Sequence, residues 1–425
     1  MQKLSSLLKK MTCDERGGVI IIFAAALPTL IIIASLILDL TYVIDRKRRL
    51  QLAADSSAYA AATYVPIYGP SYGGLTGLIS NEVTAVVTNM LPAGSLPTIS
   101  PPPSLDTTVR PYTVTVNLTE TVNGLLLGAA RKLAGASNTG NSIDISVQAR
   151  ARAQLAGDFC WLALSLTASQ AVSFNGSVTV GSPVGGSCGI AVNSNATNAM
   201  DSRGSAVSVN VPVSVVGGYQ YTGNPPPINL NFSYPVPDPY DLNGTKNTLK
   251  SLSDAAFGAS GSIRGSGTVP NSNAVSGAHY TNFSSGNTVL PSGTYYLDSI
   301  SMSGNSSVTT APGASVTIII SPDPNATISM GKNNIFSIQA PSSGNLTGIG
   351  VSSMGNATAY LYGNPTFSGA MYFPNGSVAM GGNFSSNCMQ IISQTISISG
   401  NPTVSDSGCP NGTPRAQRFL VGLTQ

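Results

Sequence analysis

The first strong pattern in the chain is an uncharged apolar run from Gly17 to Leu38, between Arg16 and Asp39. As a helix rising about 1.5 Å per residue, this run is roughly 33 Å long, which is enough to cross the hydrocarbon core of a bilayer. The run is longer than the apolar part of a cleaved signal peptide, and no small-x-small cleavage site ends it. It therefore predicts a retained transmembrane helix over 17–38, preceded by a cytoplasmic tail over 1–16.

The segment after the apolar run is rich in alanine and has no glycine or proline between Leu40 and Val65. Because alanine is the strongest helix former, this pattern predicts that the helix continues as a periplasmic stalk over 39–68. Basic residues on the stalk would lie about 10–17 Å beyond the span, within reach of lipid phosphates. The sequence thus predicts a membrane collar made of Asp39, Arg46, Lys47, Arg48 and Arg49, with contact to a protein partner as the alternative.

Alternation with a period of two marks the next predicted elements. Residues 112–118 and 143–153 alternate between apolar and polar, as half-buried strands do, and 123–134 can form a short helix between them. A proline-rich stretch over 91–111 precedes them and reads as a semi-rigid connector or an extended edge segment. We therefore expect a Pro-rich connector and a small α+β module over 69–154.

Asparagine recurs at a regular spacing in the rest of the chain. Asn-x-Ser/Thr triplets, with spacings of 20, 20, 19, 19 and 18, begin at Asn305, Asn325, Asn345, Asn364, Asn383 and Asn401. Short alternating runs lie between the triplets, and asparagine favours tight corners. The pattern predicts a right-handed parallel β-helix (solenoid) over 155–425, with one turn about every 19 residues. A β-sandwich of short strands would give similar alternation and is the alternative. The predicted fold class is mainly β with an N-terminal α-helical anchor.

The composition narrows the range of partners. Charged residues make up 9% of the chain, where soluble domains have about 25%, and the formal net charge is +3. The hydrophobic fraction of 42% is enough for a sizeable core. An ordinary cytosolic globule and a charged disordered tail are both excluded by these values. A nearly neutral chain also gives no electrostatic reason to expect nucleic acid as a partner.

The five cysteines fall into two local pairs and one single residue. Cys160 and Cys188 are 28 apart, Cys388 and Cys409 are 21 apart, and Cys13 stands before the apolar run. The pairs predict two disulfides in an oxidising compartment, with Cys13 in the reducing cytosol. Four buried free thiols are the alternative. Because positive charges flank the run almost equally, the cysteines decide the orientation. We expect a single-pass bacterial inner-membrane protein with a cytoplasmic N-terminus and a periplasmic C-terminal domain.

A series of short motifs in the N-terminal segment follows a recognisable order. Arg16-Gly17, Phe23-Ala24, Leu27-Pro28, Asp39 and the basic patch are followed by the alanine-rich box 50–62. This segment resembles the N-terminus of TadG-like and TadE-like proteins of the Tad/Flp pilus assembly family. The block 160–216 is similar to the β-helical outer regions of such proteins. The resemblance implies a non-enzymatic membrane component of a pilus assembly system, with inner-membrane lipid and pilus assembly proteins as partners.

The sequence offers few groups for chemistry. After Glu120 there is no glutamate, and His279 is the only histidine. A multi-histidine metal site is therefore excluded, and a Ser-His-Asp scheme is weakly supported. Asp238 and Asp241 form one close acidic pair, which turn chemistry explains, and His279 is expected in an exposed loop. We predict no catalytic, cofactor-binding or metal-binding residues.

Two alternative functions remain open from the sequence. The first is an envelope adhesin or carbohydrate-binding β-helix, whose surface would carry Tyr295, Tyr296, Tyr360 and Tyr362. The second is a divergent β-helix lyase, which would need Asp238, Asp241 and Asp298 to converge in one groove.

Overall fold

The computed structural model describes residues 15–68, 73–92, 96–108, 111–123, 142–180, 188–203, 206–221, 228–231, 235–362, 366–382, 388–401, 408–410 and 412–424. These residues divide into two compact units. The first contains the described residues up to Tyr64, those from Gly74 to Ala153, and those from Val421 onward. The second consists mainly of Gln154–Leu420.

The first unit is built on one long helix. α2 runs without interruption over Glu15–Ala62, so the helix predicted beyond Leu38 is present. A short helix α3 (Tyr64–Tyr68) follows α2 in the chain and belongs to the second unit from Val65 onward. In the first unit, α4 (Leu75–Met90) packs against α2. Buried positions recur every three or four residues along one face of α2, as expected for a helix that packs on one side. They are Ser35, Asp39, Arg46, Leu50, Ala53, Ala54, Ser57, Ala58, Ala61 and Ala62.

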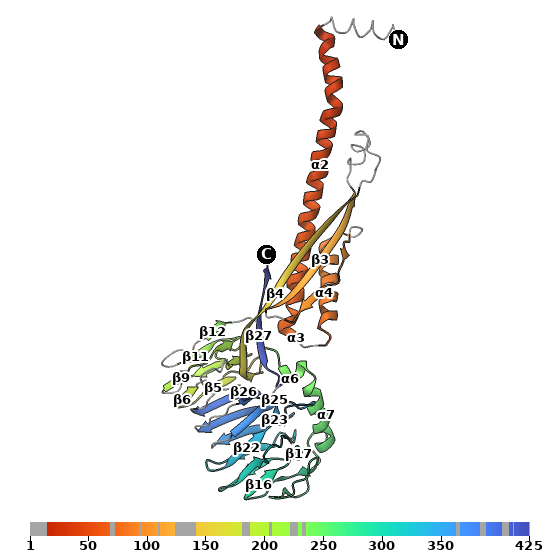
Figure 1. The fold of residues 1–425 in the computed structure, drawn as a ribbon. Helices are drawn as coiled ribbons and strands as arrows, with labels where there is room; N and C mark the ends of the chain where they lie inside the picture. Colours follow the sequence, from red (N-terminus) through yellow and green to blue (C-terminus); the bar gives the residue numbers. More distant parts are fainter. Residues whose placement is uncertain are drawn as a thin grey trace. The chain divides into compact units, whose positions relative to one another are not determined.

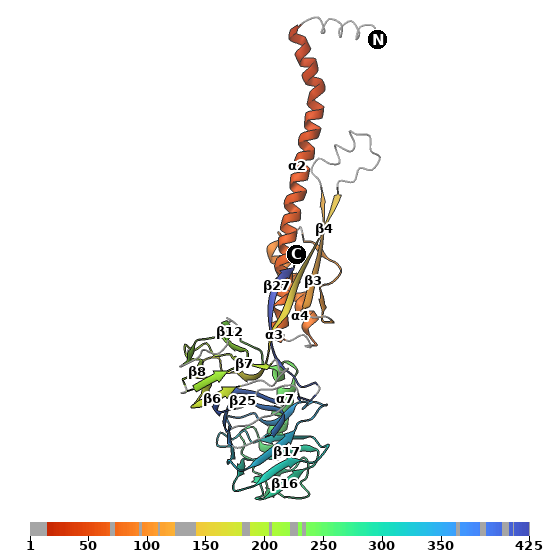
Figure 2. The same cartoon turned by 60° about the vertical axis from the view of Figure 1, so that its left-hand side comes forward.

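An antiparallel sheet lies beside these helices (Figure 1). β3 (Tyr112–Asn123) contacts α2 and pairs on one side with β1 (Thr98–Ile99) and β2 (Ser104–Asp106). Its other neighbour is β4 (Ser142–Ala163), with Tyr112 opposite Ala153 and Asn123 opposite Ser142. β27 (Ala416–Thr424) pairs with β4, beside which it lies in Figure 2.

The predicted elements of this unit are largely confirmed. Both alternating segments, 112–118 and 143–153, form strands, and alternate residues of each are buried. Part of the proline-rich stretch forms the short edge strands β1 and β2. The predicted helix over 123–134 lies outside the described residues, apart from Asn123, which ends β3.

The second unit is mainly β and begins with the last part of β4. Eight short strands follow: β5 (Val172–Phe174), β6 (Ser177–Val180), β7 (Cys188–Val192), β8 (Met200–Ser202), β9 (Ala206–Val209), β10 (Val213–Val215), β11 (Tyr219–Tyr221) and β12 (Ile228–Asn231). Two helices come next, α6 (Pro239–Leu242) and α7 (Thr245–Phe257).

The remaining strands of this unit return the chain towards β4. They are β13 (Thr268–Val269), β14 (His279–Tyr280), β15 (Asn282–Phe283), β16 (Asn287–Leu290), β17 (Gly293–Leu297), β18 (Ile300–Met302), β19 (Ser307–Thr310), β20 (Val316–Ile320), β21 (Thr327–Met330), β22 (Ile335–Gln339), β23 (Ile349–Ser353), β24 (Thr358–Tyr362), β25 (Thr366–Gly382) and β26 (Cys388–Gly400).

Every strand pair described between β5 and β26 is parallel. One ladder runs β17–β20–β23–β25–β26–β4–β7–β10, and a second runs β18–β21–β24–β25–β26–β5–β8–β11. A third joins β16, β19, β22 and β25. Parallel pairing throughout differs from the antiparallel sheets of a β-sandwich, the alternative fold considered from the sequence.

The order of the strands in space differs from their order in the chain. β26 pairs with β4 and β5, and Ile391 lies opposite Trp161 although the two stand near opposite ends of this unit's sequence. The chain therefore builds β4–β12 in one direction, passes through α6 and α7, and then winds back from β13 to β26. The two halves meet at the β26–β4 pair.

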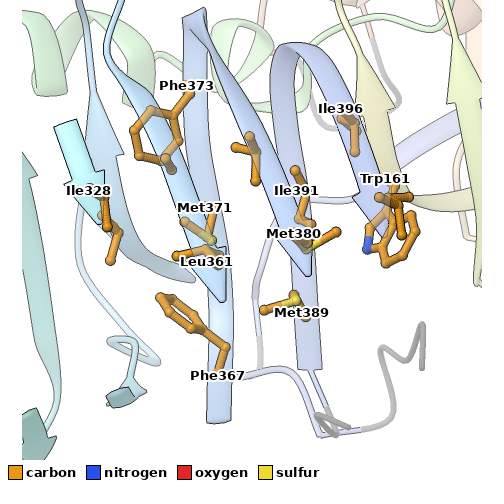
Figure 3. Close-up of a cluster of buried hydrophobic side chains, with 14 of the residues drawn as sticks. Trp161, Ile328, Leu361, Phe367, Met371, Phe373, Met380, Met389, Ile391 and Ile396 are labelled. Atoms are coloured by element: carbon orange, nitrogen blue, oxygen red, sulfur yellow. The ribbon is translucent and has the colours of Figure 1, made fainter. Parts of the chain in front are cut away.

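The core follows from the alternation of the strands. Side chains that point inward from the three ladders form one apolar cluster, part of which is drawn in Figure 3, including Trp161, Ile391, Met380 and Phe367. A second cluster lies on the outer side of the first ladder, where Leu249 and Phe257 of α7 and Tyr240 of α6 join Ile319, Tyr372 and Ile392 of the strands. The body thus has apolar packing on both sides of one ladder.

The predicted 19-residue turn needs a correction. Asn305, Asn325 and Asn345 lie outside the strands, before β19, β21 and β23, whereas Asn364 and Asn383 lie outside the described residues. Two strands separate successive asparagines, but the ladder partner of β17 is β20, three strands later. The step from Ile318 to its partner Val351 is much longer than the predicted turn, whereas Asn287 with Ser307 and Thr358 with Ser377 match it. The spacing between ladder partners therefore varies along the body. The asparagines mark corners, which that residue favours, rather than complete turns.

We expect the β26–β4 junction to be essential for the stability of the body. Ile391→Ala removes a fully buried side chain opposite Trp161 and should lower the free energy of unfolding by about 2–5 kcal/mol. Trp161 is the only tryptophan, so urea denaturation followed by its fluorescence reports on this junction. As a control, Leu166→Ala at an exposed position should change stability by no more than about 0.5 kcal/mol. Equal effects of the two substitutions would contradict the role given to the junction.

Candidate functional site

The three aspartates of the lyase hypothesis do not converge. Asp238 contacts β25, whereas Asp298 follows β17, and these strands are three steps apart along the first ladder. At about 4.8 Å per step the strands lie some 14 Å from each other. Asp241 forms an ion pair with Lys246 instead. Among the described residues, no cluster of three or more His, Cys, Asp or Glu residues could hold a metal ion.

Asp238 belongs to a polar cluster that fastens α6 to the ladder. The Tyr372 hydroxyl donates to its Oδ2 at 2.7 Å, and the Tyr240 N–H donates to its Oδ1 at 3.0 Å. The Tyr240 hydroxyl reaches Oε1 of Gln390 at 3.3 Å, and the two tyrosine rings lie 5.0 Å apart. Burial raises the pKa of Asp238 above its ordinary value, because both hydrogen bonds only partly offset the loss of water. These contacts give the cluster a structural role. The turn chemistry expected from the sequence accounts only for the N-cap contact, in which Asp238 accepts from the Tyr240 N–H.

Asn193 fixes the chain just before this cluster. Its side-chain amide donates to the Val236 carbonyl at 2.8 Å, and its Oδ1 accepts from the Val236 N–H at 2.7 Å. A buried asparagine thus satisfies both backbone groups of one residue in the segment that leads to α6. Sequence reasoning missed this contact, because Asn193 is one of many asparagines and nothing local distinguishes it.

His279 is not the exposed loop residue that the sequence predicted. It lies on β14, and its side chain is 15% exposed. Its Nε2 is 2.8 Å from Oδ1 of Asp298, whose Oδ2 accepts from the Gly265 N–H. The Phe257 ring of α7 meets the imidazole edge-on at 4.5 Å. Packed on three sides, the histidine joins β14, β17 and α7.

A shallow cavity of about 510 Å³ lies over β19, β22 and β25. Its lining includes Ser337, Gln339 and Thr366, and none of the lining residues is charged. It therefore has hydrogen-bonding groups but no acid or base of its own.

The predicted collar residues of α2 divide into buried and exposed positions. Arg46 is about nine-tenths buried and forms an ion pair with Glu120 of β3, while Asp39 is also buried. Lys47 and Arg48 are exposed, and Arg49 pairs with Asp45 one helical turn away. The predicted collar therefore included residues that are not on the surface, because the helix points Arg46 towards the sheet and Lys47 and Arg48 away from it.

The part of α2 before this pair exposes many large apolar side chains. Exposed fractions range from 42% to 61% at Phe23, Leu27, Leu30, Ile31, Ile33, Leu36, Ile37, Leu38 and Leu40. Across the residues that the structure describes, no helix combines enough length and apolar character to cross a membrane. The transmembrane helix over 17–38 thus stays a prediction.

Both predicted disulfides are present, Cys160–Cys188 and Cys388–Cys409. The first links β4 to its ladder neighbour β7, and Cys160 is the extra residue of a bulge in β4. The second ties the start of β26 to the segment that leads to β27. Each disulfide therefore lies close to the β26–β4 junction. Cys13 is outside the described residues.

The four tyrosines of the adhesin hypothesis do not share one surface. Tyr295 is fully buried and donates to the Pro291 carbonyl, and Tyr296 packs against Phe257 of α7. Only Tyr360 and Tyr362 on β24 are exposed, at 41% and 42%. Because side chains alternate along a strand, these two point to the same side.

Residues 17–63 match the family described as putative Flp pilus-assembly TadE/G-like. The N-terminal segment is TadE/G-like. The resemblance drawn from the motifs of this segment is thus confirmed, and it points to a role in Flp pilus assembly. The matched residues fall within α2 and the position after it, and include Asp39, Arg46 and the alanine-rich face that packs in the first unit.

Comparisons with whole proteins add little to this assignment. No curated protein matches the chain. Among solved structures, the chain is similar to the ice-binding protein_1 DUF3494 domain of Shewanella frigidimarina at 12% identity. That match covers 59% of this chain and 98% of the other, with a TM-score of 0.19, which is too low to establish a shared fold.

The buried pair of the TadE/G-like segment gives a test of what holds α2 to the sheet. Arg46→Ala leaves Glu120 buried without its counter-charge, so the free energy of unfolding should fall by about 3–5 kcal/mol. Arg49→Ala, which breaks an exposed pair on the same helix, should cost less than about 1 kcal/mol. Denaturation followed by circular dichroism measures both. A double variant, Arg46→Met with Glu120→Leu, should recover most of the loss, and failure of the two single variants to differ would refute the assignment.

The raised pKa of Asp238 predicts a pH dependence of stability. The folded state holds the Asp238 proton more tightly than the unfolded state does. The free energy of unfolding therefore falls as the pH rises from the unfolded pKa of about 3.9 through the higher folded pKa. Asp238→Asn should remove this component, so wild type should lose stability relative to the variant as the pH rises above about 4. Urea midpoints at several pH values measure the difference. Asp241→Asn, at the exposed acid nearby, should retain the wild-type slope, and a pH-independent difference for Asp238→Asn would count against the prediction.

Proposed function

We propose that the protein is a membrane-anchored, non-enzymatic component of a Tad/Flp-type pilus assembly system. In this proposal the apolar part of α2 lies in the inner membrane with the N-terminus in the cytoplasm. The β body is then presented in the periplasm to pilus or envelope partners. The observation that carries the proposal is the TadE/G-like match over residues 17–63.

The surface of α2 supports the anchoring part of this proposal. Large apolar side chains from Phe23 to Leu40 are exposed on the described helix, and such a surface is unfavourable in water. The exposed Lys47 and Arg48 follow directly and would meet lipid phosphates at the interface. Arg46 and Glu120 neutralise each other inside the first unit and take no part in that contact.

The second unit supports the periplasmic placement. Two disulfides persist only where thiols are kept oxidised, which in a bacterium means outside the cytoplasm. We also propose that the parallel ladders of this unit form a right-handed β-solenoid, a rigid body suited to presenting a surface. The separation of Asp238 from Asp298, each engaged in its own structural contacts, favours a binding role over catalysis.

Deletion and complementation in the native bacterium test the proposal. Loss of the protein should abolish or strongly reduce surface Flp pili, counted by electron microscopy, and the wild-type chain should restore them. A chain with Ile31→Asp and Leu38→Asp should leave the membrane fraction and fail to restore pili, because charges in hydrocarbon are costly. The matched control is Leu166→Asp, an exposed leucine of the β body, which should restore them. Normal piliation in the deletion strain would overturn the proposed function.

A further inference from the structure

Two tyrosines on β24 form an exposed aromatic surface on the second ladder. Tyr360 and Tyr362 are two residues apart on one strand, so their side chains leave the sheet about 6.6 Å from each other. They are the exposed residues of a strand whose alternate residues, Ala359 and Leu361, are buried. Two exposed aromatic rings side by side on one strand offer flat apolar faces with a polar hydroxyl at the edge, on which a ligand can pack.

The neighbouring strand is shaped to receive the Tyr362 ring. Gly381 lies opposite Tyr362 on β25, and a Cβ added there would come within 2.4 Å of the ring Cδ1 and 2.6 Å of Cε1. The ring therefore lies across the glycine, over backbone that any other residue would cover. This contact places the Cδ1–Cε1 edge of the ring over the glycine. The Tyr360 position is similar, since its partners across the ladder are the small residues Ser329 and Ala379.

Hydroxyl groups surround the two rings. Residues that lie opposite one another on successive strands form rows across the ladder. The row that contains Tyr360 also contains Ser301, Ser329, Ala379, Ser397 and Ser173. The row two residues earlier on each strand contains Thr327, Thr358, Ser377 and Thr395. None of the residues described on β18, β21, β24 or the second halves of β25 and β26 is charged. Charged residues lie at the ends of this surface: Asp298 stands before β18, Lys332 follows β21, and Asp201 of β8 lies opposite Ser173. The surface therefore offers aromatic faces and uncharged hydrogen-bonding groups together.

We propose that this surface binds a neutral polysaccharide, with Tyr360 and Tyr362 stacking on successive sugar rings. The C–H face of a pyranose carries partial positive charge and packs on the electron-rich face of an aromatic ring. The serine and threonine hydroxyls both donate and accept, which matches the hydroxyl rim of a sugar. An uncharged surface fits an uncharged polymer, whereas an acidic polysaccharide would find no basic group on these strands.

Other exposed aromatic residues lack these features. Tyr219 and Tyr221 on β11 stack on each other with ring centres 5.5 Å apart, so each ring already covers a face of the other. Tyr221 is 45% exposed, close to the value for Tyr362, and it serves as a matched control.

Affinity electrophoresis of the full chain in detergent tests the proposal. Gels would contain hydroxyethyl cellulose, dextran, glucomannan or laminarin as neutral probes, and alginate as the acidic probe. We expect at least one neutral polysaccharide to retard the protein, equally at low salt and at about 0.5 M salt, since no charge is involved. Tyr360→Ala and Tyr362→Ala should each weaken that binding at least tenfold, whereas Tyr221→Ala should leave it unchanged.

Gly381→Ala separates ring placement from ring chemistry. The added methyl group must push the Tyr362 ring off its position, so binding should fall although both tyrosines remain. Tyr362→Phe should retain most binding if stacking dominates. Unchanged denaturation midpoints show that each variant is folded. Lack of retardation by all four neutral probes, retardation by alginate alone, or native binding by the tyrosine variants would overturn the proposal, and none of these results bears on piliation.

Discussion

Parallel strand pairing is the constraint on which the rest of the β body depends. Strands that pair in parallel cannot be joined by a tight turn, so no strand here is completed by the residues next to it in the chain. Most strands find partners only after a long stretch of intervening chain, as Val378 does with Ile396 and Ile318 with Val351. For β4 the partner is β26, and Trp161 meets Ile391 across nearly the whole sequence of the body. The body is therefore stable only as a whole, with its apolar interior shared between both halves.

Local patterns predicted most of the elements but not their order in space. Alternation located β3 and β4, because burying every second side chain leaves a trace in the sequence. The uninterrupted alanine-rich segment likewise predicted that the helix continues beyond Leu38, although α2 ends at Ala62 rather than at residue 68. Nothing in the residues around Trp161 points to Ile391, since an apolar strand accepts many apolar neighbours. The asparagine repeat marks the corners between strands, but the positions of corners do not determine which strands become ladder partners.

The site residues show the same division between local and long-range information. The two disulfides were predictable because each pair is close in sequence and set apart from the other cysteines. The basic patch was misread at Arg46, because its partner Glu120 lies far along the chain on β3. The tyrosines were grouped by residue type, but only strand register distinguishes Tyr295, which points inward, from Tyr360, which points out. The role of Gly381 depends on where the ring of its ladder partner Tyr362 lies.

The continuity of α2 has a mechanical consequence. A helix of 48 residues is a rod of about 72 Å, and here the same rod carries both the exposed apolar side chains and the alanine face that packs in the first unit. Alanine has no side-chain rotamers to absorb strain, and these buried alanines pack within the first unit. A force or torque applied near Leu30 is therefore transmitted along the helix to the buried residues Ala53 and Ala58 with little bending of the helix between them. Force exerted at one end of the rod should be felt as strain in the module at the other.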